Sequence, residues 1–147
     1  MNKKEITLGY VWPGSFAVAD DPWDEFHHDE YPDMVKKYPK NEIILPADKV
    51  YTLVIDYPLN KPFKGTFKTS SRGMTRQEFA DLAAKTYQMI YKIEDDMEGP
   101  TPNIPGMLNR QTSDGPFGIW GHSIDGLTIH TLYVDELNRV IELGVDS

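Results

Sequence analysis

Four residues whose side chains could bind a divalent metal ion come from two distant parts of the sequence. His27 and His28 are adjacent near the N-terminus, and His122 and Asp125 lie together in a later loop. Neutral imidazole nitrogen and carboxylate oxygen are common ligands of zinc and related ions. Their spacing matches no standard zinc motif. A metal-binding protein or metal-assisted hydrolase that uses His122, Asp125 and either His27 or His28, with a divalent metal ion as cofactor, is therefore an alternative hypothesis.

Structural roles are the competing interpretation for each histidine. His27 and His28 lie in an acidic field, which favours the imidazolium form on a solvated surface. His122 would position its own loop by bonding backbone carbonyls. His130 alternates with Thr128 and Leu132 in a predicted strand. This pattern favours a half-buried ring that is hydrogen-bonded to a neighbour.

A second chemical feature is a run of uncompensated acids at residues 20–33, called the acidic stretch below. It holds seven Asp and Glu and no Lys or Arg, whereas the rest of the chain has 16 acids against 15 bases. Trp23, Phe26 and Tyr31 are interleaved with the acids. Solvating charge needs no aromatic rings, whereas a recognition surface uses rings for contact area and carboxylates for steering.

The acidic stretch therefore predicts a non-catalytic binding protein of the inhibitor, immunity or adaptor type, with a basic protein as its partner. The predicted partner-binding residues are Asp20, Asp21, Trp23, Asp24, Glu25, Phe26, Asp29, Glu30 and Tyr31. Like-charge runs are also common as solvated loops, so a loop whose aromatics anchor it to the domain is the competing interpretation. A structural or assembly subunit that forms a homo-oligomer is a third hypothesis.

Several kinds of chemistry are excluded or unsupported by the sequence. The absence of cysteine excludes disulfides, thiolate zinc sites, iron–sulfur clusters and cysteine nucleophiles. Neither a phosphate-binding glycine loop nor a nucleophile elbow is present. We therefore predict no catalytic residues and, apart from the metal alternative, no cofactor.

Net charge and hydropathy limit the partners further. The formal charge of −8 and the pI near 4.9 argue against nucleic-acid binding, which requires clustered Lys and Arg. No apolar run approaches the roughly 20 residues of a membrane-spanning helix. Glu5, Gly9 and Pro13 interrupt the N-terminal apolar residues, so we predict a cytoplasmic protein without a secretory leader.

Alternation of apolar and polar residues predicts strands in both halves of the chain. Residues 50–57 and 63–69 alternate apolar and polar positions around a Pro-containing turn, which predicts a hairpin with one basic face. Residues 127–134 and 139–145 predict a second hairpin, with Ile129, Thr131 and Tyr133 on one face. Residues 5–12 and 41–45 predict two further strands.

A long amphipathic helix is predicted over about residues 76–96. Thr75 and Glu78 form a capping box, and apolar residues follow at helical spacing. Four acids crowd its C-terminal end, Glu94, Asp95, Asp96 and Glu98, where the helix dipole is already negative. These acids belong either to an exposed end or to a second anionic patch.

These elements predict one domain over residues 1–147 with an α+β fold. An antiparallel sheet of four to six strands carries the helix across one face. The Pro-containing acidic segment 13–49 and the irregular Gly/Pro loop 98–121 lie between the regular elements.

Overall fold

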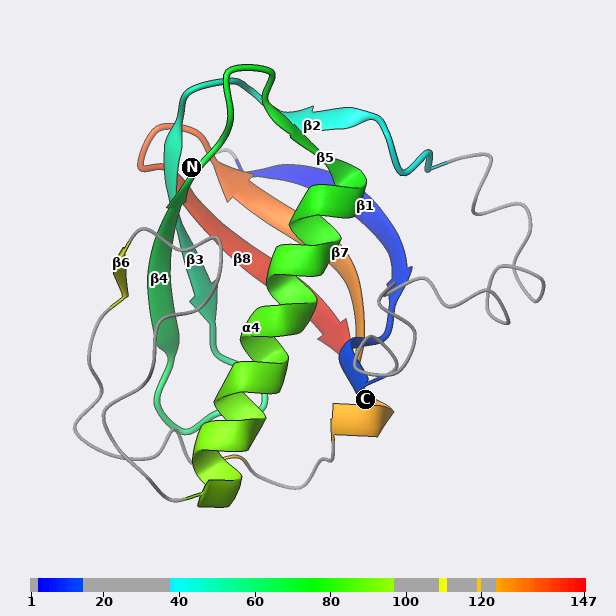
Figure 1. The fold of residues 1–147 in the computed structure, drawn as a ribbon, viewed down its shortest axis with the longest axis vertical. Coiled ribbons are helices and arrows are strands. Elements are labelled where there is room, and N and C mark those ends of the chain that lie inside the picture. The colour runs from blue at the N-terminus through cyan, green and yellow to red at the C-terminus, as the bar shows by residue number, and fades with distance from the viewer. Residues whose placement is uncertain (1–2, 15–37, 97–108, 111–118, 120–123) are drawn as a thin grey trace.

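The structure, a computed structural model, describes residues 3–14, 38–96, 109–110, 119 and 124–147. Its strands are β1 (Lys4–Val11), β2 (Ile43–Leu45), β3 (Val50–Ile55), β4 (Phe63–Lys68), β5 (Met74–Thr75), β6 (Asn109–Arg110), β7 (Thr128–Asp135) and β8 (Val140–Asp146). Its helices are α4 (Arg76–Asp96) and the short 3-10 helix η1 (Ile124–Gly126). The predicted α+β fold, with one long helix across one face of the sheet, is confirmed (Figure 1).

The main sheet has the strand order β1-β7-β8-β3-β4-β6. Four of its pairings are antiparallel, as predicted, but β8 runs parallel to β3, so the sheet is mixed. The chain between β3 and β8 includes α4, which provides the long crossover that a parallel pairing requires. The parallel ladder begins where the backbone N–H of Thr52 donates to the carbonyl of Arg139 at 2.8 Å.

Both predicted hairpins form. In the first, Val50 pairs with Lys68 and Ile55 with Phe63, so one continuous register joins β3 to β4. The face toward α4 is buried and the opposite face carries the lysines, as the alternation predicts. The buried residues of this hairpin are Tyr51, Leu53, Ile55, Phe63, Gly65 and Phe67.

One detail of the second hairpin differs from the prediction. Ile129 is buried, but Thr131 and Tyr133 do not share its face, because the β7–β8 register shifts between Ile129 and Thr131. The extra residue of this β-bulge changes which side chains point into the core. Beyond the bulge, Leu132 and Val134 face the core.

Helix α4 begins at the predicted cap. The backbone N–H of Glu78 donates to Thr75 Oγ1 at 3.1 Å, and the N–H of Thr75 donates to Glu78 Oε1 at 2.9 Å. These reciprocal bonds satisfy donors that an uncapped helix start leaves unpaired. No helix among the described residues is long and apolar enough to cross a membrane.

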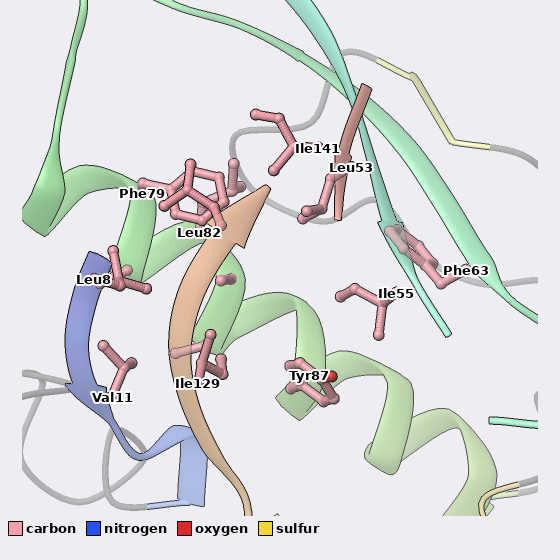
Figure 2. Close-up of a cluster of buried hydrophobic side chains, with 14 of the residues drawn as sticks. Leu8, Val11, Leu53, Ile55, Phe63, Phe79, Leu82, Tyr87, Ile129 and Ile141 are labelled. Carbon is pink, nitrogen blue, oxygen red and sulfur yellow. The ribbon is translucent and has the colours of Figure 1, made fainter. Parts of the chain in front are cut away.

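The core lies between α4 and the main sheet. Figure 2 shows side chains of β1, β3, β4, β7, β8 and α4 converging in this layer. Tyr87 is fully buried, and its hydroxyl donates to the carbonyl of Tyr57 at 2.7 Å. Burial raises the pKa of Tyr87 well above its usual range. The Tyr87 ring therefore packs in the core, and its hydroxyl links α4 by a hydrogen bond to the chain just after β3.

A cluster at the β7–β8 turn joins this turn to β3. The buried Tyr51 hydroxyl donates to Glu136 Oε1 at 2.7 Å, and the Arg139 guanidinium lies 5.6 Å from the centre of the Tyr51 ring. Burial and the bond to Glu136 raise the pKa of Tyr51 to about 12. Tyr51 therefore stays protonated at neutral pH and holds the turn as a hydrogen-bond donor.

Strands β2 and β5 form a small separate sheet beside the start of α4. Gly73 is the residue directly before β5. Gly73 has a φ of 94°, which L side chains rarely adopt. A Cβ there would lie 2.6 Å from the carbonyl oxygen of Leu45 and 2.8 Å from a side-chain carbon of Ile43. Glycine is therefore required by both conformation and space.

We expect Gly73→Ala to lower the free energy of unfolding by about 2 kcal/mol, because the new methyl group meets backbone that cannot move aside. Gly126→Ala is the matched control, since a Cβ at Gly126 meets no atom within 4 Å. Urea unfolding measures both variants. Equal stability of the two would contradict the assignment.

The β7–β8 turn generates a pH-dependence prediction. The Asp135 carboxylate accepts hydrogen bonds from Asn138 Nδ2 at 2.9 Å and from the backbone N–H groups of Asn138 and Leu137, each at 3.1 Å. These bonds, with the Asn138 side chain foremost, hold the pKa of Asp135 below its usual range. The ionised carboxylate therefore stabilises the fold above its unfolded-state pKa, and this stabilisation is lost as pH falls through the folded-state pKa.

We expect Asp135→Asn to be less stable than the unmodified protein at pH 7. The difference in stability between the two proteins should shrink below about pH 4, because protonation then neutralises the Asp135 carboxylate of the unmodified protein. Urea unfolding at several pH values between 7 and 3 measures the difference. A difference that stays constant with pH would show that the Asp135 charge is not responsible.

Candidate functional site

The nine predicted partner-binding residues lie outside the described residues, in the range 15–37. Their binding role stays a prediction. What the structure does describe is the chain on either side of residues 15–37, at two places called the attachment points below. These attachment points are built by α4 and β1.

The first attachment point follows β1. The side-chain amide of Gln88, in the middle of α4, donates to the carbonyl of Pro13 at 2.8 Å, and Pro13 is buried. The rings of Tyr10 and Trp12 lie 5.9 Å apart in a tilted arrangement just before it. An open pocket of about 250 Å³ lies along this part of α4, lined by Lys85, Gln88, Met89 and Lys92.

The second attachment point is organised by Arg76, the first residue of α4. Its Nη1 donates to the carbonyl of Pro39 at 2.7 Å and to Glu42 Oε1 at 2.7 Å, and its Nε donates to the carbonyl of Thr7 in β1 at 3.0 Å. The guanidinium also lies 5.7 Å from the centre of the Tyr38 ring. One side chain therefore joins the helix, the edge strand β1 and the segment that returns from residue 37.

Burial makes these contacts strong. The Arg76 side chain is 5% exposed, whereas the Glu42 side chain is 54% exposed. A buried guanidinium has to be matched by acceptors, and Arg76 has two backbone carbonyls and one carboxylate. The backbone N–H groups of Arg76 and Gln77 add bonds of 2.9 Å to the carbonyls of Glu42 and Lys40. The returning segment thus also satisfies donors at the helix start.

Both attachment points therefore lie on one helix. Twelve residues separate Arg76 from Gln88, so the two points are about 18 Å apart along α4. Arg76 was missed by sequence reasoning, yet a signal exists. Arg76 lies on the same helix face as the buried residues Phe79, Ala80 and Ala83. An arginine on this face is buried, and its guanidinium therefore needs hydrogen-bond acceptors.

The metal-site prediction remains untested. His27, His28 and His122 lie outside the described residues, and of Asp125 only the backbone, in η1, is described. Among the residues that the structure describes, no group of three or more His, Asp and Glu could hold a metal ion. The structure therefore does not test whether the four candidates come together.

His130 has the structural environment that its strand position predicts. Its Nδ1 lies 2.8 Å from Thr131 Oγ1, and its Nε2 lies 3.5 Å from Asp146 Oδ1. The side chain is half-buried, and the ring occupies space that a Cβ at Gly144 would need. His130 is therefore explained by packing across the β7–β8 hairpin.

The C-terminal end of α4 keeps its two interpretations. The helix continues to Asp96 and has no basic residue in its last turn, where a cation would offset the negative end of the helix dipole. Glu98 and the side chains of Asp95 and Asp96 lie outside the described part of the chain. A second anionic patch at this end stays a prediction.

Comparison of the chain with protein-family models, with curated proteins and with solved structures finds no match. A function must therefore be inferred from the charge distribution and the geometry of the chain itself.

We expect Arg76→Gln to lower the free energy of unfolding by about 2–4 kcal/mol, because it removes three hydrogen bonds and leaves two carbonyls without their donor. Arg72→Gln is the matched control, since Arg72 is exposed in the turn before α4 and should change stability by less than about 0.5 kcal/mol. Urea unfolding compares the two. Equal effects would show that Arg76 does not hold the attachment point.

Proposed function

We propose that this protein is a non-catalytic acidic binding protein that presents residues 20–33 to a basic surface on a partner protein. One observation carries the proposal: the charge of the body and the charge of the stretch are separated. The described residues contain thirteen Lys and Arg against fourteen Asp and Glu, so the body is almost neutral. The seven acids of the stretch account for nearly all of the remaining net charge.

Attachment at both ends supports a recognition role. The segment leaves near Gln88 and returns at Arg76, so the acidic stretch is part of a closed loop rather than a free tail. Closing a loop removes part of the conformational entropy that a partner would otherwise have to restrict.

The residue types of the stretch fit the chemistry of such a contact. Carboxylates attract a basic surface over a Debye length and raise the association rate, and this effect weakens with salt. Trp23, Phe26 and Tyr31 would supply the buried contact area, since aromatic anchors dominate binding energy at interfaces. An inhibitor, immunity protein or adaptor that covers a cleft evolved for a polyanion, such as the substrate cleft of a nuclease, uses this combination.

The cytoplasm is the compartment that we propose, since a cysteine-free chain has no structural need for an oxidising environment.

The test replaces Asp20, Asp21, Asp24 and Glu25 with their amides. Immobilised unmodified protein is used to capture a partner from the source cell, and association rates are then measured by surface plasmon resonance at several salt concentrations. We expect the fourfold variant to associate about tenfold more slowly and to show a flatter salt dependence.

A control variant removes the same charge from the body, through Glu5→Gln, Asp48→Asn, Asp56→Asn and Asp146→Asn, all at exposed positions. It should associate at close to the unmodified rate. If both variants slow association equally, net charge rather than the stretch is responsible. If neither does, the proposal is wrong.

A further inference from the structure

The turn between β7 and β8 carries the most exposed large apolar side chain that the structure describes. Leu137 lies in this turn and is 87% exposed, whereas the next in order, Ile43, is 49% exposed. A single exposed leucine is ordinary on a protein surface. A leucine that is held rigidly, beside a second exposed apolar side chain, has the features of a binding anchor.

The backbone around Leu137 is fixed by contacts on both sides. The Asp135 carboxylate accepts a hydrogen bond from the backbone N–H of Leu137 at 3.1 Å. On the other side, the carbonyl of Arg139 accepts the N–H of Thr52 in β3 at 2.8 Å. Because the turn is ordered by its own contacts, a partner that binds Leu137 does not have to restrict this backbone, which lowers the entropic cost of binding.

A second exposed aliphatic side chain lies beside this turn. Val50 is the first residue of β3 and is 46% exposed. In the parallel ladder Thr52 pairs with Val140, so Val50, two residues earlier, lies next to the residues that precede Val140, which form the turn. Neighbouring strands are about 4.8 Å apart. Leu137 and Val50 therefore lie close together at one end of the sheet (Figure 1).

A lysine lies on each side of this apolar pair. Lys68, the last residue of β4, pairs with Val50, and Lys4, the first residue of β1, pairs with Val134 just before the turn. Both lysines are exposed, and neither forms an ion pair with a described residue. The strand order β1-β7-β8-β3-β4 puts them about 19 Å apart across the sheet, with the turn between them. Leu137, Val50, Lys4 and Lys68 are called the turn patch below.

The acids near the turn patch do not neutralise it. Three carboxylates near the turn are already bonded within the protein, namely Asp135, Glu136 and Glu142. Asp48 is exposed just before β3, and the adjacent Lys49 offsets its charge. Positive charge at Lys4 and Lys68 is therefore left for a partner to match.

We infer that the turn patch docks on an acidic surface of a partner protein, with Leu137 seated in an apolar recess that carboxylates surround. Charge complementarity selects this occupant, because two lysines without described carboxylate partners flank an apolar centre. An apolar centre with a polar rim is the usual anatomy of a protein interface. This contact is independent of the proposed function, since it involves described residues and a partner of the opposite charge.

The net charge of the chain favours a protein partner over an extended polyanion. At −8, the chain as a whole is repelled by a nucleic acid or by an anionic membrane. An acidic recess on a protein meets only the turn patch. A chain that uses both this patch and its acidic stretch would be an adaptor between an acidic and a basic protein.

The first experiment identifies what lies against Leu137 in the source cell. Leu137 is replaced with the photoreactive amino acid p-benzoylphenylalanine, and the same replacement at Ile43 is the control, since Ile43 is the next most exposed apolar residue. We expect illumination to join position 137, but not position 43, to an acidic protein. No adduct at position 137, or an adduct only with a second copy of this chain, would overturn the inference.

The second experiment measures the affinity of the purified partner by calorimetry. Leu137→Ser, at a position where the side chain supports no fold contact, should raise Kd at least about tenfold. Lys4→Glu with Lys68→Glu should also raise Kd at least about tenfold, because like charges then face each other.

Lys61→Glu with Lys64→Glu is the matched control, with the same charge change at exposed positions toward the other end of the β3–β4 hairpin. It should change Kd by less than about threefold, since charges beyond a Debye length from the contact are screened. A Kd that Leu137→Ser leaves unchanged, or equal effects of the two charge variants, would overturn the inference.

Sedimentation with lipid vesicles tests the competing occupant. Vesicles of phosphatidylcholine with about 30% phosphatidylserine present an anionic surface without a protein recess. We expect the unmodified protein to stay in the supernatant. Sedimentation with these vesicles that Leu137→Ser abolishes would assign the turn patch to a lipid surface and overturn the inference of a protein partner.

Discussion

The buried guanidinium of Arg76 is the interaction on which the arrangement of this protein depends. It links the start of α4 to β1 through the Thr7 carbonyl and to the returning segment through Pro39 and Glu42. A charge with 5% exposure is stable only while all of these acceptors stay in place. Helix, edge strand and returning segment are therefore fixed together, and the ends of the acidic segment are fixed with them.

The positive and negative charges of the described body are nearly equal in number. Several cations of the body are matched within the fold, as Lys3 is by Glu142 and Arg139 by Glu136. The seven acids of residues 20–33 come between the two attachment points in the sequence. The described body is thus nearly neutral, and the acids of residues 20–33 carry most of the net charge of the chain.

Much of the fold was predictable because it depends on short-range patterns. Alternation in residues 50–69 predicts a hairpin, and the Thr75–Glu78 box predicts the start of α4, since both are set by neighbours in the sequence. The bulge in β7 was not predictable, because one extra residue reverses the alternation between Ile129 and Leu132 without a local signal. The parallel pairing of β8 with β3 depends likewise on a crossover that no local pattern describes.

The segregation of charge, the two hairpins and the amphipathic helix follow from contiguous residues, because composition and periodicity are local properties. Only contacts between distant residues show that Arg76 is a buried clamp rather than a surface residue. Tertiary contacts also set the parallel pairing of β8 with β3. Both depend on strand order and on contacts between residues far apart in the chain, such as Thr7 with Arg76, and burial of that arginine gives those contacts their strength.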